Sequence, residues 1–270
     1  MKRGNYGIMP GNRVYKGEDC MQFGIYVPGQ PWNEAGRAIR EMLREEKLGE
    51  IHTDTMRLRI DGGLADLCTD TYFVAHEDGT AFSRLWYGWA RGRDCTVGNF
   101  GNFLTLEQVR GQGIGKRMLE LWHRDLTCRE DKPLALFCSA KEQAAKLYFP
   151  YGFHTAIKGA KEGPLFMPVA DSGWDFDTFC DMYYQPADVL ISRPATFGWR
   201  HEIDCLLHFA LRVRGEKFGI GDVIRLEPAL LYYPQRARLF FTPEDRCVGW
   251  SVDDVAQIHP AYRHLRVETE

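Results

Sequence analysis

The sequence predicts an α/β fold, in which a mixed central sheet is flanked by helices, followed by a smaller C-terminal α+β unit. Three features lead to this prediction. An aromatic-rich hairpin is centred on Asp78-Gly79, a favoured turn pair. A strand pattern runs into a glycine-rich turn that opens an amphipathic helix. Near residue 170 the pattern changes, and a connector rich in Trp, Phe and Asp begins.

The bulk composition is that of an ordinary globular chain. With 270 residues, of which 44% are hydrophobic, the chain is long enough for two domains with buried cores. The net charge of −3 gives no reason to expect a nucleic-acid partner. Eight scattered cysteines show no zinc-ligand spacing, so we expect reduced thiols and no metal. Because neither a membrane-length apolar run nor a secretory signal is present, we expect a cytoplasmic protein without a membrane partner.

The N-terminal half reads as strands around one long helix. Residues 1–20 are glycine-rich and polar, which indicates a loosely held arm. Apolar residues at helical spacing predict a helix from about Pro31 to Leu48, and Gly49 follows as a stop signal. Short apolar or alternating runs predict strands at residues 21–27, 55–60, 71–76, 81–89 and 96–105.

The remainder of the first domain follows the glycine-rich turn. Helices are expected at residues 113–126 and 140–151, and strands at 133–139, 153–157 and 165–169. We place a domain boundary near residue 170, which gives a first domain of residues 21–169 and a second of residues 170–270. In the second domain we expect a strand at 189–192, a helix at 201–213, and extended segments at 230–233, 237–241 and 247–252.

The glycine-rich turn is the motif that carries chemistry. It reads Arg110-Gly111-Gln112-Gly113-Ile114-Gly115, directly before the helix. The first amide groups of a helix lack partners within the helix, and the helix dipole adds positive charge there, so such a turn can hold a phosphate. Lys116 and Arg117 stand in the first helical turn, where a cation is unfavourable unless an anion is bound.

Two other nucleotide motifs fit less well. A P-loop requires a different glycine spacing, and Arg117 stands where its magnesium-binding hydroxyl should be. A dinucleotide fingerprint requires an acidic residue about twenty positions further on, at the end of a second strand. Glu130 and Asp131 are at that distance, but neither clearly ends a strand.

The continuation of the motif resembles the GNAT superfamily of acyltransferases. After Arg-x-x-Gly-x-Gly at 110–115 come an amphipathic helix, a buried strand, and Leu147-Tyr148 followed by Gly152-Phe153. This order is similar to that family over about residues 21–169, most strongly over 97–154. Two positions depart from the family pattern: Lys141 stands where asparagine is frequent, and Glu107 where proline is frequent.

The resemblance implies a GNAT acyltransferase fold with acetyl-CoA as co-substrate. The pyrophosphate would lie on the amides of the turn, with Arg110 shaping the turn or reaching a phosphate. The end of the preceding strand would splay from its neighbour and polarise the thioester carbonyl. The implied acetyl-CoA contacts are Leu104, Thr105, Arg110, Gly111, Gln112, Gly113, Ile114, Gly115, Lys116 and Lys141.

Two residues are the expected catalytic groups. By resemblance Tyr148 is the general acid for the departing thiolate, although Tyr151, one turn further on, could be confused with it. Glu107 is the expected general base; Asp94 and His76 are weaker candidates. The aromatic residues of 82–89 could line an acceptor pocket, although such a stripe is more often core packing.

The sequence therefore predicts an N-acetyltransferase that moves acetyl from acetyl-CoA to a primary amine of a small molecule or peptide by direct attack. A non-catalytic acyl-CoA-binding or regulatory protein is the alternative. The second domain resembles the first half of another GNAT domain, but His264-Leu265-Arg266 replaces the glycine turn, and an unrelated α+β unit is the alternative. Such an incomplete sheet leaves an open edge, so a homodimer is one expectation for the assembly.

Overall fold

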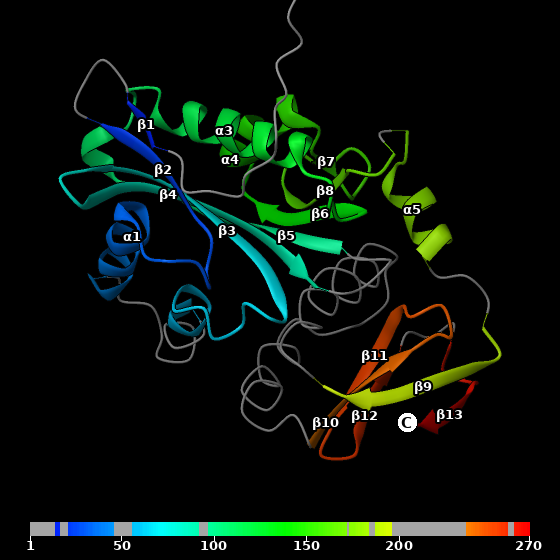
Figure 1. Cartoon of the computed structure of the whole chain (residues 1–270). Coiled ribbons are helices and arrows are strands. Elements are labelled where there is room, and N and C mark those ends of the chain that lie inside the picture. The colour runs from blue at the N-terminus through cyan, green and yellow to red at the C-terminus, as the bar shows by residue number, and fades with distance from the viewer. Residues whose placement is uncertain are drawn as a thin grey trace, which may run out of the picture.

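The computed structural model describes residues 14–16, 21–45, 56–91, 97–171, 173–183, 187–195, 236–258 and 262–270. Their strands form two sheets (Figure 1), with eight strands in the order β1-β2-β3-β4-β5-β6-β8-β7 and five in the order β12-β11-β10-β9-β13. The first sheet contains β1 (Val14–Lys16), β2 (Gln22–Tyr26), β3 (Cys68–Glu77), β4 (Thr80–Ala90), β5 (Val97–Thr105), β6 (Ala135–Ala140), β7 (His154–Thr155) and β8 (Gly163–Pro168).

The first sheet is mixed, as the sequence predicts. Strands β1 to β5 pair with one another in antiparallel fashion, β5 and β6 are parallel, and β8 is antiparallel to both β6 and β7. The predicted hairpin is confirmed: Glu77 pairs with Thr80, and the two turn residues Asp78 and Gly79 have φ values of 47° and 79°. Positive φ at both positions is what a type I′ turn requires, and Asp-Gly supplies it.

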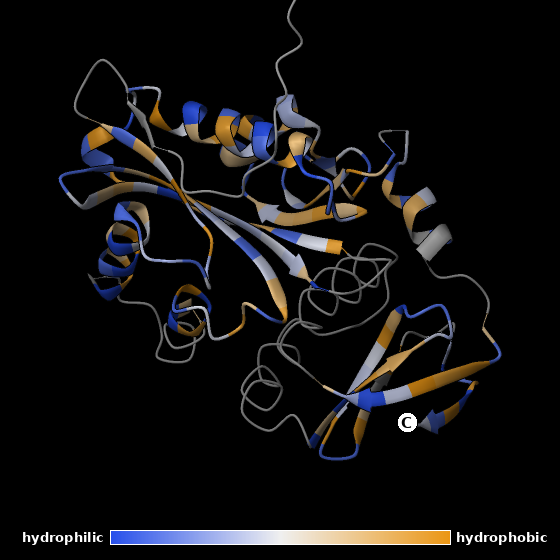
Figure 2. Ribbon diagram, in the orientation of Figure 1, coloured by the Kyte–Doolittle hydropathy of each residue, from blue (hydrophilic) through white to orange (hydrophobic). Residues whose placement is uncertain are grey.

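Helices cover both faces of this sheet (Figure 1): α1 (Glu34–Glu45) lies on one face, and α3 (Ile114–Cys128) and α4 (Glu142–Tyr148) lie on the other. Both long helices mix hydrophobic and hydrophilic residues along their length (Figure 2), so each can bury one side. The predicted apolar side of α3 is confirmed, with Ile114, Met118, Trp122 and Leu126 buried. The predicted α1 begins later than Pro31, because Asn33 caps it by accepting from the Gly36 amide at 2.8 Å.

The strand expected at residues 55–60 is wrong, because residues 56–60 are helical. An alternating strand would place Met56, Leu58 and Ile60 on one side. Instead Met56 and Ile60 are 4% and 1% exposed, whereas Leu58 is 42% exposed. Burial of the first and fifth residues is the helical spacing, and five residues are too few to distinguish the two periods from sequence.

A helix that the sequence did not predict, α5 (Phe176–Tyr183), packs on the first sheet. The rings of Phe176 and Phe179 lie 5.6 and 5.2 Å from the ring of Phe166 on β8. The domain boundary near residue 170 stays a prediction, and these contacts favour a position for it after α5.

The second sheet contains β9 (Val189–Pro194), β10 (Ala237–Phe241), β11 (Cys247–Val252), β12 (Val255–Ile258) and β13 (Arg266–Thr269). Its four antiparallel strands β9 to β12 follow one another in chain order, as β2 to β5 do in the first sheet. Strand β13 adds to β9 in parallel. The bounds predicted for β10 and β11 are confirmed, while the predicted helix 201–213 and extended segment 230–233 lie outside the described residues.

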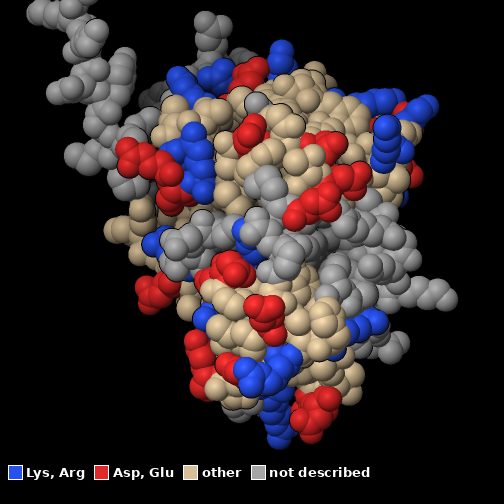
Figure 3. Space-filling view, turned by 90° about the vertical axis from the view of Figure 1, so that its right-hand side faces the viewer, with Lys and Arg blue, Asp and Glu red and all other residues tan. Residues whose placement is uncertain are grey.

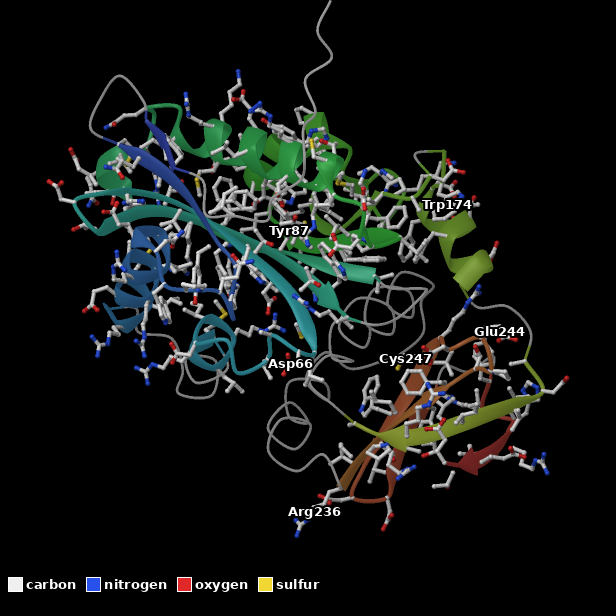
Figure 4. All side chains as sticks on the ribbon, viewed as in Figure 1. Asp66, Tyr87, Trp174, Arg236, Glu244 and Cys247 are labelled. Carbon is white, nitrogen blue, oxygen red and sulfur yellow. The ribbon has the colours of Figure 1, made fainter. Side chains whose placement is uncertain are left out.

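Polar contacts hold α3 to the sheet at its C-terminal end. Tyr87, labelled in Figure 4, lies between the sheet and α3 and donates a hydrogen bond to Asp125. Arg129 forms a two-point ion pair with Asp131 at 2.9 Å and stacks 4.9 Å from the centre of the Trp89 ring. These contacts fix the direction in which the opposite end of the helix points.

The face of the molecule shown in Figure 3 carries charges of both signs. On the face shown in Figure 3, basic and acidic side chains are interspersed, in keeping with a net charge of −3. None of the helices in the described part of the chain is long and apolar enough to span a membrane.

His76 on β3 makes the stability of the fold sensitive to pH. Its side chain is 1% exposed and both ring nitrogens lack a hydrogen-bond partner. Burial lowers the pKa of His76 below its usual value, and Glu34 opposes this only partly. As pH falls below about 6.5, the unfolded chain binds a proton that the folded chain resists, so the free energy of unfolding decreases.

We therefore expect the melting temperature to fall between pH 7.5 and pH 5.5, and to fall less in His76→Leu. The leucine variant should lose no stability at pH 7.5, because an unpaired buried imidazole is replaced by an apolar side chain. Thermal unfolding at the two pH values measures both effects. An equal pH-dependent decrease in the variant would assign the effect to other groups, such as His123 and His154, whose pKa values burial also lowers.

Candidate active site

The candidate site is the place where β5 and β6 part. The two parallel strands pair only through three residues each, Val97 to Asn99 on β5 and Ala135 to Phe137 on β6. The end of β6 pairs with β8 on its other side, whereas residues 100–105 of β5 keep only β4 as a ladder partner. The predicted splay is therefore confirmed, and one backbone edge of this part of β5 has no ladder partner among the described strands.

A β-bulge marks the same part of β5. Arg84 pairs with Leu104 and Trp86 with Gly101, so β5 has one residue more than β4 between these pairs. Within this interval Asn102 has a φ of 50°, a left-handed conformation that asparagine tolerates better than most residues. A bulge turns backbone groups out of the ladder, which makes them available to a bound molecule.

The glycine-rich turn forms the start of α3. Gly111 and Gly113 have φ values of 80° and 78°, and an added Cβ at either would meet no atom within 4 Å. Gly113 is the N-cap residue, and no side chain caps the helix. Among the described residues, no acceptor receives a hydrogen bond from the amides of Gln112, Gly113, Ile114, Gly115 or Lys116.

Contacts between the turn and β5 place these amides next to the splay. A Cβ on Gly115 would lie 3.3 Å from the Phe103 ring and 3.7 Å from Thr105 Oγ1. Arg110 donates from Nε to the Thr105 carbonyl at 3.0 Å, so this side chain shapes the turn. Thr105 is held in turn by a 2.9 Å hydrogen bond between its hydroxyl and that of Ser83. Among the described residues, the glycine-rich turn and the unpaired edge of β5 therefore adjoin.

Tyr148 reaches the same region from α4. Its ring lies 6.2 Å from Phe103 at the bulge, and 5.1 and 6.0 Å from Phe100 and Phe153. The residue is 7% exposed, and its hydroxyl makes no hydrogen bond within the described structure. Burial, with a smaller contribution from Cys138, raises the pKa of Tyr148 well above its usual value. The phenol therefore remains a proton donor at neutral and mildly alkaline pH.

Tyr151 faces elsewhere. Its ring lies 6.2 Å from Trp122 and 5.5 Å from His123, both on α3. Cys138 on β6 is 6% exposed, and burial raises its pKa, so this thiol is poorly suited to act as a nucleophile. Of the two tyrosines, Tyr148 is the one whose ring contacts the bulged strand.

The other predicted site residues lie around this centre. Leu104 is half-buried on the α1 face, and Ser83 Oγ donates to its carbonyl at 2.9 Å. Lys116 is exposed in the first turn of α3, and Gln112 donates to the Gln108 carbonyl at 3.4 Å. Lys141 is exposed immediately before α4. Its neighbours Ser139, Ala140, Glu162 and Gly163 line a surface cavity of about 250 Å³ with it.

Glu107 lies in the short 3-10 helix η1 (Glu107–Val109), between the end of β5 and the glycine-rich turn. Its side chain is exposed, and its carbonyl accepts a hydrogen bond from the Arg110 amide at 3.1 Å. This position is four residues past the Asn102-Phe103 bulge. His76 is buried within the sheet, and Asp94 lies outside the described residues.

Sequence reasoning missed the bulge and the left-handed conformation of Asn102. The local signal was weak, because Gly101-Asn102 inside a strand pattern is a common indication of a bulge but not a specific one. Among the described residues, no group of three or more His, Cys, Asp or Glu side chains is arranged to hold a metal ion.

Comparisons with known proteins agree with this architecture. Residues 69–155 match the model of the family described as "Acetyltransferase (GNAT) domain". No curated protein sequence matches the chain. The matched segment includes the hairpin, the bulged strand, the glycine-rich turn and Tyr148.

Solved structures that match part of this chain include a GNAT family N-acetyltransferase (YhbS) from Escherichia coli in complex with CoA. It is 19% identical, with 62% of this chain and 87% of that chain covered and a TM-score of 0.38. An acyl-CoA N-acyltransferase from Pseudomonas aeruginosa is 16% identical, with 54% and 99% covered and a TM-score of 0.38. Escherichia coli ElaA is 14% identical, with 54% and 99% covered and a TM-score of 0.39.

The family match, together with the mixed sheet that splays beside a glycine-rich helix start, assigns the function class. Residues 69–155 match a GNAT acetyltransferase domain, and this match indicates an acyltransferase.

Proposed function

We propose that the protein is an N-acetyltransferase that binds acetyl-CoA in the splay between β5 and β6 and transfers the acetyl group directly to a primary amine. The amine belongs to a small molecule or a peptide. The observation that carries this proposal is the convergence of unpaired amides at the start of α3, the bulged edge of β5 and the Tyr148 ring.

The glycine-rich turn fits the diphosphate of acetyl-CoA. Its amides point to no acceptor in the described structure, and the open space at Gly111 and Gly113 would be filled by any larger side chain. A diphosphate would supply the missing acceptors and would interact favourably with the helix dipole. Lys116 and Arg110 stand next to it as cations. Leu104, Thr105 and Lys141 are the proposed contacts further along the pantetheine arm.

The chain's own residues then have separate tasks. Acetyl-CoA supplies a thioester whose carbonyl carbon the amine attacks. Backbone amides at the β5 bulge would stabilise the negative charge that develops on the carbonyl oxygen. As the carbon–sulfur bond breaks, Tyr148 would give its hydroxyl proton to the leaving sulfur. The amine loses a proton in the same reaction, and a base or water must accept it.

Glu107 is our candidate for that base, acting through water. Because its carboxylate is exposed, bulk water can partly replace it, so we expect only about a tenfold decrease in kcat for Glu107→Gln at neutral pH. The decrease should be larger at lower pH, where free amine is scarce. Steady-state rates at pH 6.5, 7.5 and 8.5 measure it, and a rate equal to that of the wild type at all three values would remove Glu107 from the mechanism.

The experiment that tests the whole proposal measures thiol release from acetyl-CoA in the presence of a series of amines. Calorimetry with CoA runs in parallel. CoA binding with amine-dependent thiol release supports the proposal. CoA binding without thiol release for any amine would favour a non-catalytic acyl-CoA-binding protein. Lys141, which stands at a frequent asparagine position, favours that second function, because one expected polar contact is changed.

A further inference from the structure

Of the glycines in β4 and β5, Gly101 differs from Gly88 and Gly98 because packing does not explain its missing side chain. Gly88 on β4 has a packing reason, since an added Cβ would lie 2.4 Å from Asp70 Oδ1. Gly98 on β5 also has a packing reason, since an added Cβ would lie 2.9 Å from the Gly88 carbonyl oxygen and 2.8 Å from the Leu136 side chain. Gly101 has no positive φ, and no neighbour in the described part of the chain lies within 4 Å of an added Cβ.

A glycine without such a reason needs another explanation. Glycine weakens the interior of a strand because it has more freedom to lose and no side chain to pack. At Gly101 the described structure would accommodate an alanine. Strand glycines often mark places where a ligand comes close to the backbone. The open space beside Gly101 is therefore a candidate for part of a binding site.

The arrangement of Trp86 keeps this space open. Trp86 is the ladder partner of Gly101, so both face α1. The indole is drawn away along the strand: its Nε1 donates to Asp70 Oδ1 at 2.8 Å, and its ring lies 3.3 Å from a Cβ built on Gly88. Arg59 contacts both Asp70 and Trp86. It donates a 2.8 Å hydrogen bond to the Asp70 carboxylate, and its guanidinium lies 5.0 Å from the centre of the Trp86 ring.

The position of this space suggests its use. Gly101 lies two residues past the last β5 pair with β6, and one residue before Asn102 at the bulge. Phe103 and Tyr148 pack on the opposite, α3 face. A molecule above Gly101 would therefore approach the splay from the face opposite to Tyr148. An amine on that face could add to the thioester carbonyl and would leave the α3 face to the phenol that protonates the sulfur.

We propose that the space beside Gly101 admits the acceptor amine, and that the absent side chain at this position determines which acceptors the enzyme takes. The proposal rests on the proposed acetyltransferase function. The preferred acceptor is a primary monoamine on a flat, apolar body, because the side chains on this face around Gly101 and Asn102, Trp86 and Met56, belong to one apolar cluster. Met56 is brought to this place by a 3.5 Å contact from Asn102 Nδ2 to its sulfur.

Charge argues against two other acceptor classes. The carboxylate in the neighbouring row of the ladder, Asp70, is already paired with Arg59 at 2.8 Å, and both side chains are at most 6% exposed. Asp70 is therefore not available to the additional ammonium groups of a polyamine, and Arg59 is not available to an acidic amino acid. Desolvating such charges without new partners is costly.

The test compares Gly101→Ala and Gly101→Val with the wild type, with 2-phenylethylamine, spermidine and L-glutamate as acceptors. We expect the wild type to have the highest kcat/KM for 2-phenylethylamine. Gly101→Ala should lower kcat/KM for 2-phenylethylamine about tenfold, and Gly101→Val about a hundredfold. Even one methyl group that occupies the substrate's position in a binding site has effects of this order. CoA affinity by calorimetry should stay within about twofold of the wild type.

Thermal unfolding separates this effect from misfolding. Gly101→Ala should melt about 2 °C higher than the wild type, because alanine restricts the unfolded chain and meets no obstacle in the strand. The matched control Gly88→Ala should melt lower, because its methyl group would collide with Asp70.

Several outcomes would overturn the inference. Wild-type kcat/KM for 2-phenylethylamine in Gly101→Val would contradict the role of position 101, and so would a loss of CoA affinity equal to the loss of rate. Preference for spermidine or L-glutamate, or no turnover of the three amines by a protein that binds CoA, would contradict the acceptor class. Failure of the wild type to bind CoA would instead refute the proposed function itself.

Discussion

Gly113→Asp is expected to lower the affinity for CoA by about a hundredfold or more while leaving the fold intact. Gly113 is the N-cap of α3, has a φ of 78°, and has no atom within 4 Å of an added Cβ. Aspartate is one of the few larger residues that tolerate this conformation. Its carboxylate would lie beside the first-turn amides and repel a diphosphate. Two unit charges about 5 Å apart repel by about 3 kcal/mol at an effective dielectric constant of about 20.

The matched control is Gly113→Asn, which has the same size and backbone preference but no charge. It should lose about tenfold in affinity at most, because steric interference remains without repulsion. Calorimetry with CoA measures both variants, and melting temperatures show whether they fold. Equal losses in the two variants would mean that shape and not charge matters at this position. If both variants bound CoA as tightly as the wild type, the diphosphate would have to bind at another place.

Tyr148→Phe is expected to lower kcat by about a hundredfold to a thousandfold, the usual contribution of general acid catalysis. Phenylalanine preserves the ring contacts with Phe100, Phe103 and Phe153, so the KM for acetyl-CoA should change little. Steady-state kinetics with saturating amine measure both constants. A decrease in kcat/KM caused entirely by KM would indicate a binding role instead.

The pH dependence gives an independent check on Tyr148. A general acid acts in its protonated form, so its contribution is lost only as pH rises through its pKa. Burial raises the pKa of Tyr148 above its usual value of 10, so the wild-type rate should not decline through this group below about pH 10. The ratio of wild-type to variant kcat should therefore stay constant from pH 7 to pH 9.5. Tyr151→Phe, whose ring packs on α3, should behave like the wild type.

The parts of the site that could be predicted are those governed by short-range rules. The glycine-rich turn was predictable because positive φ values at Gly111 and Gly113 and a helix start without a side-chain cap are local properties. Tyr148 was placed by its position in a family pattern, and the structure puts its ring against Phe103. Strands β10 and β11 were predictable for the same reason, since a turn separates two short runs of strand-forming residues.

The parts that could not be predicted depend on long-range contacts. The segment at residues 56–60 becomes helical because Met56 and Ile60 are both buried under the α1 face of the sheet. The packing of α5 depends on Phe166, ten residues or more away in sequence. The distance between Asp70 and Trp86, which decides that Gly88 is needed for packing and Gly101 is not, is set by the register of β3 against β4.

By itself, the sequence determined that a strand is followed by a glycine-rich turn and a helix start without a side-chain cap, because backbone conformation and hydrogen bonding there involve only neighbouring residues. Tertiary structure alone decided where β5 leaves β6, which face carries Tyr148 and which face is open beside Gly101. These features arise from strand pairing and side-chain packing between residues far apart in the chain, and no local pattern encodes them.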